Sequence, residues 1–521
     1  MRIKAEVALI LLAALIPSAY LAWRYADMPH LGHFHDDGVY LTTARSLAEG
    51  SGYRILSLPG EPNQIKFPPL YPAYVALAWR LNPFPANLRW ITLLTWLLLP
   101  ALLAALMIFY RGMGFDPVKC ACLAAIVALS PHTALLAQSV MSEIMATLLV
   151  VCSLSAAARR TTRSAVVAGV FAGAAFLTRS ATVAILPGLV LYYLLNKQKR
   201  AALCFALSMA PFAAAWQAWA FLLRPQAVTE DILFYATYMG HWTANFSLVD
   251  IPALVWKNTG VFLFGVGGLL VYTVEPDLVS GNLLRLATYG AVAGAVRLAF
   301  RNGLSPYHCF AIFYIPVVLT WIYAPHERFV YPLLPLIAAG FVTEAGHLSS
   351  MLRRALRHSQ WSQRAVASVL IGLLVCLTAY AAWRAGDGLT QFLPLVFEQA
   401  RTLRAAQEEA SRWIVQNTPK DARFIAYNDP VLFLYTGRKA TGVHFPPRLA
   451  YEGGRSQVVE YFASAAAFAR RNNYPYLLLT PADFGQDLSP EERIEVRKRL
   501  RAELPAPEYS ASGVHVYRLS R

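Results

Sequence analysis

Two adjacent carboxylates stand shortly after the first apolar segment of the chain. Asp36 and Asp37 lie in the segment 33–40 (HFHDDGVY), where two histidines precede them. A carboxylate at a membrane surface, partly desolvated and near a hydroxyl, is suited to act as a general base. Asp is also a preferred helix N-cap, and a helix beginning here would end at Gly50. The pair therefore has two interpretations, a helix cap and a catalytic group, and one carboxylate can cap while the other reacts.

A lysine followed by prolines comes next. Residues 66–72 (KFPPLYP) predict an extended approach and then a helix that begins near Leu70 and continues to residue 81. This helix is short for a membrane span, so we expect it to lie in the interface, with Tyr71 at the level of the lipid headgroups. Lys66 would lie at the level of the lipid phosphates, either as a generic interfacial lysine or as a phosphate ligand.

Three further charged side chains fall at the ends of apolar segments: Glu143, Arg179 and Arg328. Ionisable residues at such a depth usually face a cavity and mark a functional site. Two of them also have a structural interpretation, since Glu143 can stabilise a helix N-terminus and Arg328 can extend to the membrane surface. Together with the Asp pair, these charges are suited to a ligand that carries an anionic phosphate and a reacting hydroxyl.

A membrane-embedded scaffold must position these residues, because the composition is that of a polytopic membrane protein. The chain has 521 residues, of which 57% are hydrophobic and only 15% are charged, whereas soluble domains have about 25% charged residues. The formal charge of +16 therefore indicates membrane topology and not nucleic-acid binding. The six cysteines lie in or beside apolar segments and show neither a disulfide framework nor metal-ligand spacing.

Apolar segments of approximately spanning length recur along the chain. Glycines at 265, 267 and 268 weaken the segment 258–274 as a helix, so we expect that segment to be interfacial or re-entrant and the chain to have about 11 to 13 spans. The segments lie near residues 7–23, 88–110, 118–136, 139–157, 165–177, 181–195, 201–222, 258–274, 283–300, 308–324, 331–347 and 366–384.

Basic clusters between the spans indicate the orientation, because Lys and Arg prefer the cytoplasmic side of a membrane. Placing the N-terminus and these clusters in the cytoplasm puts the first loop, residues 24–87, outside together with the Asp pair. The C-terminal part is then outside as well. We predict a multi-pass protein of the inner (plasma) membrane whose candidate site lies on the extracytoplasmic, or periplasmic, face.

The composition changes near residue 396. Beyond it the pattern predicts helices over 400–416, 458–471 and 491–500 and strands over 423–427, 476–479 and 514–519. Helices that alternate with strands indicate a small α/β domain, and it has no glycine-rich phosphate loop. The expected fold class is mainly α, with a transmembrane helical bundle over 1–395 and a small extracytoplasmic α/β domain over 396–521.

At these motifs the chain resembles the polytopic glycosyltransferases of the GT-C fold. The most similar group contains the protein O-mannosyltransferases and the aminoarabinose transferase of lipid A (glycosyltransferase family 39-like). The resemblance covers residues 5–385 and rests on four features in the order that the family shows. They are the acidic pair with Tyr40 and a helix ending at Gly50, the segment 66–72, a helix with Gly169 and Gly173 leading to Thr178-Arg179, and Arg328-Phe329 before a proline-rich span.

The resemblance implies an inverting glycosyltransferase that uses a polyprenyl-phosphate sugar as its donor. It makes Asp36 the base that activates a lipid, glycan or protein acceptor, while Asp37 orients the acceptor or the sugar hydroxyls. Lys66, Arg179 and Arg328 are candidates for binding the leaving phosphate. Further candidates for substrate binding are Tyr40, Tyr71 and Glu143.

Two other functions stay open on the sequence. Charges in the middle of spans or repeated halves would favour a lipid-linked-sugar transporter or flippase without transferase activity. The notable charges of this chain fall instead at helix ends, and neither half repeats the other. A structural membrane subunit with a C-terminal binding domain leaves the acidic pair and Lys66 without a joint purpose. The spacing of ligand-type residues requires no metal, although Asp36 and Glu143 could together hold a divalent ion.

Overall fold

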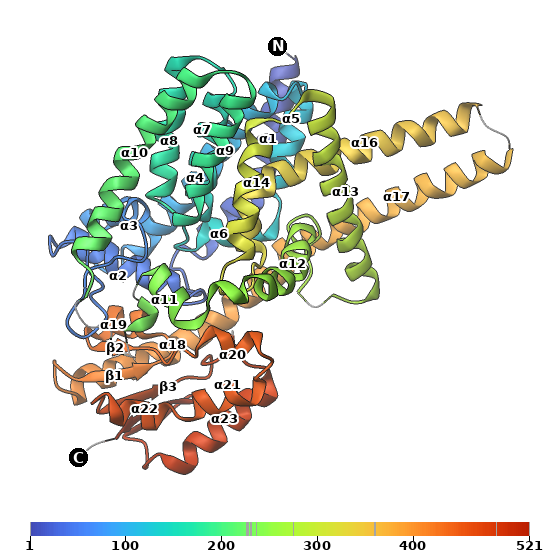
Figure 1. Cartoon of the computed structure of the whole chain (residues 1–521). Coiled ribbons are helices and arrows are strands. Elements are labelled where there is room, and N and C mark those ends of the chain that lie inside the picture. The colour runs from blue at the N-terminus through green and yellow to red at the C-terminus, as the bar shows by residue number, and fades with distance from the viewer. Residues whose placement is uncertain are drawn as a thin grey trace.

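Most of the protein is helical, and the strands gather near the C-terminus (Figure 1). The computed structural model describes residues 2–519 except 226–228, 230, 231, 236, 275, 359, 360 and 486. In Figure 1 the apolar helices stand side by side in the upper part of the molecule, and the sheet with its own helices lies below them.

Each apolar segment predicted from the sequence contains a helix. Six helices are long and apolar enough to cross a membrane, and α5 and α6 form a pair bent by 65° that could be one broken span. Four apolar stretches are shorter (Glu143–Ala157, Thr162–Phe176, Ser180–Leu195 and Pro306–Leu319), and the expected 11 to 13 spans require these to cross as well. The protein is a multi-pass membrane protein. The bundle helices are α1 (Arg2–Arg24), α4 (Leu88–Gly112), α5 (Pro117–Ala128), α6 (Pro131–Gln138), α7 (Glu143–Ala157), α8 (Thr162–Phe176), α9 (Ile185–Leu195), α10 (Lys199–Leu222), α12 (Ile251–Gly268), α13 (Leu278–Asn302), α14 (Pro306–Leu319), α16 (Leu334–His358) and α17 (Trp361–Asp387).

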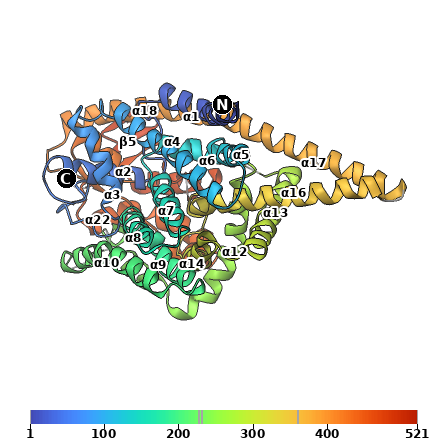
Figure 2. The same ribbon diagram turned by 90° about the horizontal axis from the view of Figure 1, so that it is seen from above.

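Helices α16 and α17 extend together away from the bundle as an arm (Figures 1 and 2). The near part of α16 packs against α13. Helix α17 exposes apolar side chains such as Val366, Val369 and Leu373, as a lipid-facing helix does. A short π-helical stretch, Gly388–Phe392, then connects it to α18 (Leu393–Asn417), which leads into the C-terminal domain.

The first loop is folded around short helices. Helix α2 (Asp36–Ala48) begins at the Asp pair and ends where Gly50 adopts a φ of +75°. The Gly50 N–H donates to Leu47 O and the Ser51 N–H to Ser46 O, which is the Schellman ending predicted from the glycine. Helix α3 (Leu70–Ala76) and the 3₁₀ turn Leu77–Arg80 follow the prolines as expected. Short elements in later loops are the 3₁₀ turns Ser180–Ala184, Leu233–Tyr235, Leu248–Asp250 and Tyr331–Leu333, with α11 (Tyr238–Asn245) and α15 (Glu327–Val330).

The C-terminal domain is a five-stranded sheet covered on both faces. The strands lie in the order β2-β1-β3-β5-β4; β1 is parallel to β2 and β3, and β5 is antiparallel to β3 and β4. Because side chains alternate along a strand, Ile425 and Leu477 face α21–α23, while Phe424 and Tyr476 face α18 and α19. The elements are β1 (Arg423–Ala426), α19 (Asp429–Thr436), β2 (Lys439–Thr441), α20 (Pro447–Tyr451), α21 (Arg455–Ala463), α22 (Ala465–Arg471), β3 (Tyr476–Leu479), α23 (Pro490–Glu503), β4 (Tyr509–Ala511) and β5 (Val514–Arg518).

This domain packs directly on the first loop. Helix α19 contacts α2, and a Cβ added to Gly38 would lie 2.8 Å from the Cβ of Pro430, so a glycine is needed for the close approach. The Lys439 ammonium donates to Glu61 and to the carbonyl of Leu56, both at 2.6 Å. The docking brings the residues that follow β1 and β2 next to the Asp pair.

Candidate active site

A cavity of about 740 Å³ lies where the first loop, several helix ends and the C-terminal domain meet. Its volume is within the range of small-molecule sites, about 300–1,000 Å³. The membrane part contributes His33, His35, Asp36, Tyr40, Lys66, His132, Arg179, Tyr238, Glu327 and Arg328, among others, and the C-terminal domain contributes Tyr427, Val443, His444, Phe445, Phe462 and Asp487.

Four side chains singled out in the sequence form a row of alternating charges beside this cavity. Arg328 donates to the Asp36 carboxylate, and its Nε lies 3.2 Å from Glu143 Oε1. Arg179 donates to the same Glu143 oxygen at 2.9 Å. Glu143 is fully buried, so the two guanidinium groups supply the counter-charge that a buried carboxylate requires.

Three helix ends create this row. Glu143 is the first residue of α7, Arg179 follows the end of α8, and Arg328 lies in α15 just before α16. The helices α7 and α8 are consecutive and pack against each other, and the ion pair between Glu143 and Arg179 brings the start of α7 to the residues after the end of α8. The charges therefore converge where helices begin or end and not in the middle of a long helix.

Asp36 is the carboxylate that faces the cavity, with a side chain 19% exposed. Burial raises the pKa of Asp36, but the charge and the hydrogen bond of Arg328, with the charge of Lys66, lower it by more. The pKa of this carboxyl is therefore below its usual value, and the group is ionised at neutral pH.

Asp37 is turned toward the backbone of its own loop. Its two oxygens accept hydrogen bonds from the N–H groups of Gly32 at 2.8 Å and Gly38 at 2.7 Å. Burial raises the pKa of Asp37 to about 6, against the opposing effect of these amides. Asp37 is absent from the described cavity lining, so its contacts favour holding the loop over contacting a substrate.

Lys66 points into the same cavity from the loop before α3. Its ammonium donates to the carbonyl of Phe234 at 2.6 Å and lies 3.7 Å from the centre of the Phe234 ring. Burial lowers the pKa of Lys66 to about 8, although Asp36 opposes the shift. Among the described residues no carboxylate forms an ion pair with Lys66, so this cation has capacity for an anionic ligand.

The two candidate tyrosines lie at different depths. Tyr40 lines the cavity, and its hydroxyl is 3.1 Å from that of Ser142. Tyr71 is fully buried behind it, with the ring packed edge-on against the Tyr40 ring at a centroid distance of 5.2 Å. Tyr40 can reach a ligand, whereas Tyr71 supports Tyr40.

The sequence allowed a divalent ion between the carboxylates of Asp36 and Glu143, but the guanidinium group of Arg328 lies between them. Asp36 and Glu143 both pair with Arg328.

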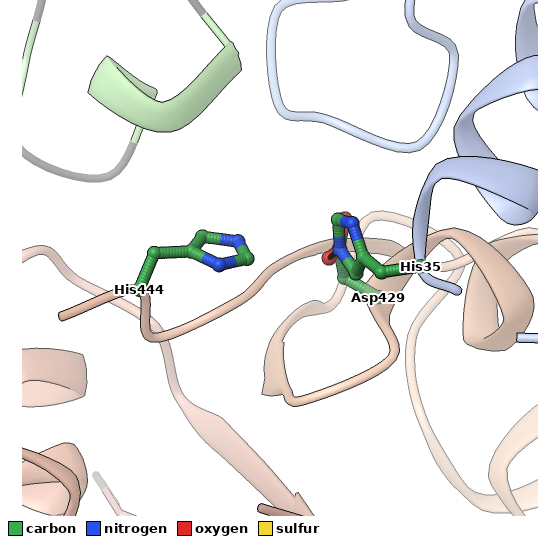
Figure 3. Close-up of side chains that lie close together, drawn as sticks. All are labelled: His35, Asp429 and His444. Atoms are coloured by element: carbon green, nitrogen blue, oxygen red, sulfur yellow. Dashed lines mark hydrogen bonds and ion pairs between the residues drawn. The ribbon is translucent and has the colours of Figure 1, made fainter. Parts of the chain in front are cut away.

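A different group of ligand-type side chains, His35, Asp429 and His444, lies close together at the edge of the cavity (Figure 3). Sequence reasoning missed this group because His35 is 394 positions before Asp429, and Asp429 and His444 alone show no metal-ligand spacing.

Comparisons with known proteins agree on the architecture. No model of a known protein family matches the sequence, and no curated protein matches it significantly. The crystal structure of ArnT from Cupriavidus metallidurans bound to undecaprenyl phosphate is similar, with a TM-score of 0.56, 16% identity and coverage of 99% of this chain and 98% of that chain. The apo form of ArnT has a TM-score of 0.50, 14% identity and 93% coverage of both chains. ArnT is a glycosyltransferase of the GT-C type.

This chain has the GT-C fold. The likeness extends over the bundle and the C-terminal domain together, since it covers nearly the whole of both chains. An oligosaccharyltransferase from Archaeoglobus fulgidus, tethered to an acceptor peptide, is also similar, with a TM-score of 0.49, 14% identity and coverage of 99% of this chain and 74% of that chain. At 14–16% identity the likeness to the two ArnT structures establishes the fold and not the activity.

Proposed function

We propose that this protein is an inverting glycosyltransferase that moves a sugar from a polyprenyl-phosphate carrier to an acceptor on the extracytoplasmic face of the membrane. One observation carries the proposal: the cavity holds an ionised carboxylate, Asp36, beside the cations Lys66, Arg179 and Arg328 at one end of a bundle of apolar helices. A base next to a phosphate-binding cluster at a membrane surface is suited to a lipid-phosphate substrate.

The cations bind the phosphate of the donor. Arg328 and Arg179 present guanidinium groups, which match the geometry of a phosphate, and Lys66 adds a point charge from the first loop. The structure of ArnT bound to undecaprenyl phosphate supports a polyprenyl carrier for this fold. The polyprenyl chain would lie along the apolar helices, with the sugar in the cavity.

The reaction is a single displacement. The acceptor oxygen or nitrogen attacks the anomeric carbon from the side opposite the phosphate, and its proton passes to Asp36. The bond between the anomeric carbon and the phosphate oxygen breaks, and its electron pair leaves on the carrier phosphate. The cations stabilise the charge that develops on this leaving group.

Donor binding activates the base in this scheme. Arg328 donates a hydrogen bond to Asp36, and a carboxylate in an ion pair is a poor proton acceptor. A donor phosphate competes for the Arg328 guanidinium and releases Asp36 for the acceptor. Glu143 keeps both arginines in place during this exchange, since it contacts Arg179 and Arg328 through the same oxygen.

Release of polyprenyl phosphate from a labelled polyprenyl-phosphate sugar by the purified protein tests the function. Asp36→Asn should reduce the release by at least about 100-fold, because it removes the base while keeping the shape of the side chain. Asp27→Asn is the matched control, since Asp27 is an exposed carboxylate of the same loop that pairs with Arg401. Full activity of the Asp36→Asn variant would show that Asp36 is not the base.

The alternative is a transporter of lipid-linked sugars. If the protein is such a transporter, the wild-type form would bind the donor but release no polyprenyl phosphate, whichever acceptor is supplied. It would also require charges along a path through the bundle, whereas the row from Asp36 to Arg179 lies at one end. The same assay therefore separates the two functions.

A further inference from the structure

Three metal-binding side chains from distant parts of the chain meet between the first loop and the C-terminal domain. His35 precedes α2, Asp429 begins α19 and His444 follows β2, and one ligand atom from each lies within 4.8 Å of the others. In Figure 3 the ring of His444 is directed at the His35–Asp429 pair. None of the three belongs to the row of charges that starts at Asp36.

A fourth ligand-type atom lies among them. The hydroxyl of Tyr235 is 2.6 Å from Asp429 Oδ1 and 3.3 Å from the Nε2 atoms of both His35 and His444. His35 Nε2 is 3.0 Å from the same Asp429 oxygen. A tetrahedral zinc site with bonds of about 2.0–2.2 Å separates its ligand atoms by about 3.3–3.6 Å, so small side-chain shifts would complete such a site here.

The central carboxylate of the group, Asp429, is not fully hydrogen-bonded by the described residues. Asp429 is fully buried, and its Oδ2 has no hydrogen-bond partner among the described residues. A buried carboxylate with an unpaired oxygen is costly, and a bound cation removes that cost. The ring of Phe234 stacks on His444 with centroids 3.8 Å apart, which holds the imidazole in the orientation that ligation requires.

We propose that His35, Asp429 and His444, with the Tyr235 oxygen as fourth ligand, bind one divalent transition-metal ion. Two imidazoles with a carboxylate and a phenol oxygen favour zinc over calcium or magnesium, which prefer oxygen ligands only. Four protein ligands leave no open position, so the ion is structural.

This ion ties the C-terminal domain to the first loop. It holds His35, the neighbour of Asp36, and it fixes the segment 443–445 that forms part of the cavity wall. The inference does not depend on the glycosyltransferase reaction, because the ligands and their geometry are independent of the donor and the acceptor.

Metal analysis of the full-length protein, purified in detergent without a polyhistidine tag, tests the site. After incubation with zinc and removal of excess metal, the wild-type protein should retain about one zinc per chain, as expected for one closed site. His444→Gln and Asp429→Asn should lose most of it. His515→Gln is the matched control, because His515 belongs to the same domain but bonds to Ser510 in the β4–β5 hairpin.

X-ray absorption of the wild-type protein gives a second, mutation-free measurement. The expected spectrum has four nitrogen or oxygen neighbours at about 2.0 Å and the scattering signature of imidazole. Absence of tightly bound zinc, an unchanged zinc content in both cluster variants, or a shell of six oxygens without imidazole would each overturn the site. Size-exclusion profiles identify a variant that loses zinc because it has unfolded. In that case the X-ray absorption spectrum of the wild-type protein decides whether the site exists.

Discussion

Arg328 occupies the pivotal place in the site, because it contacts a carboxylate on each side. Asp36 faces the cavity and Glu143 is buried behind it. An arginine between two carboxylates stays in position when one of them is released, since the other still holds it. This arrangement allows a donor phosphate to replace Asp36 on Arg328 without leaving an unpaired guanidinium.

In the proposed reaction, Lys66 makes donor binding dependent on pH. Its pKa is lowered to about 8, and only the protonated form attracts a phosphate. The charge is present below about pH 8 and is lost above it, while a phosphodiester donor keeps its charge throughout. The wild-type KM for the donor should therefore rise about tenfold or more between pH 7 and pH 9.5, because donor binding loses a charge-assisted hydrogen bond. The groups that face Lys66 are Asp36, His241, His444 and Tyr238.

The control for this prediction is Lys66→Arg, which keeps its charge in this pH range. Steady-state kinetics should show a donor KM that stays level for the variant where that of the wild type climbs. A wild-type KM that is constant up to pH 9.5 would mean that the Lys66 charge does not contact the donor.

Residue types and spacing were enough to single out the charges that meet. Asp36, Glu143, Arg179 and Arg328 were each noticed because a charge at the end of an apolar segment is uncommon, and the structure brings them into one row. That Asp36 faces the cavity while Asp37 binds the backbone of its own loop could not be predicted, because it depends on which way each side chain turns.

At the scale of elements, long patterns were predictable and short ones were not. The apolar segments and the strand Tyr476–Leu479 were found from periodicity and composition. The predicted helix over 458–471 is divided at Ser464 into α21 and α22. Strands β2 and β4, of three residues each, and helix α19 were missed, because so few residues give no period and their pairing partners are distant in sequence.

Gly38 joins the two elements that carry the site, α2 and α19. A methyl group there would meet Pro430 at 2.8 Å, so Gly38→Ala should lower the free energy of unfolding by about 1–3 kcal/mol, as overpacking does. Thermal unfolding in detergent and protease sensitivity of the C-terminal domain measure the effect.

Gly346→Ala in α16 is the matched change, because an added Cβ at Gly346 meets nothing within 4 Å. This variant should be neutral or slightly stabilising, since alanine is the better helix former. Equal stability of both variants would show that the approach of α2 to α19 is less tight in solution.

At the scale of the whole molecule, the cavity exists only because three parts of the chain converge. The first loop, the helix ends and the C-terminal domain each supply lining residues. The sequence predicts the bundle and the α/β domain but contains no signal for how they dock, since docking depends on shape. The contacts made by Gly38, Lys439 and Asp429 are therefore visible only in the folded protein.

The ends of the same helices predict the orientation of the molecule in the membrane. Glu143 and Arg179 lie beside the cavity, so the turn between α7 and α8 and the start of α8 lie at the other end, with Arg159, Arg160 and Arg163. Basic turns favour the cytoplasm. Each cysteine is introduced singly into a cysteine-free variant of the protein. In intact cells, a membrane-impermeant maleimide should label Ser51→Cys in the first loop. Arg163→Cys should react only after permeabilisation, and both positions are exposed. Labelling of Arg163→Cys alone in intact cells would place the cavity on the cytoplasmic side and contradict the extracytoplasmic reaction proposed above.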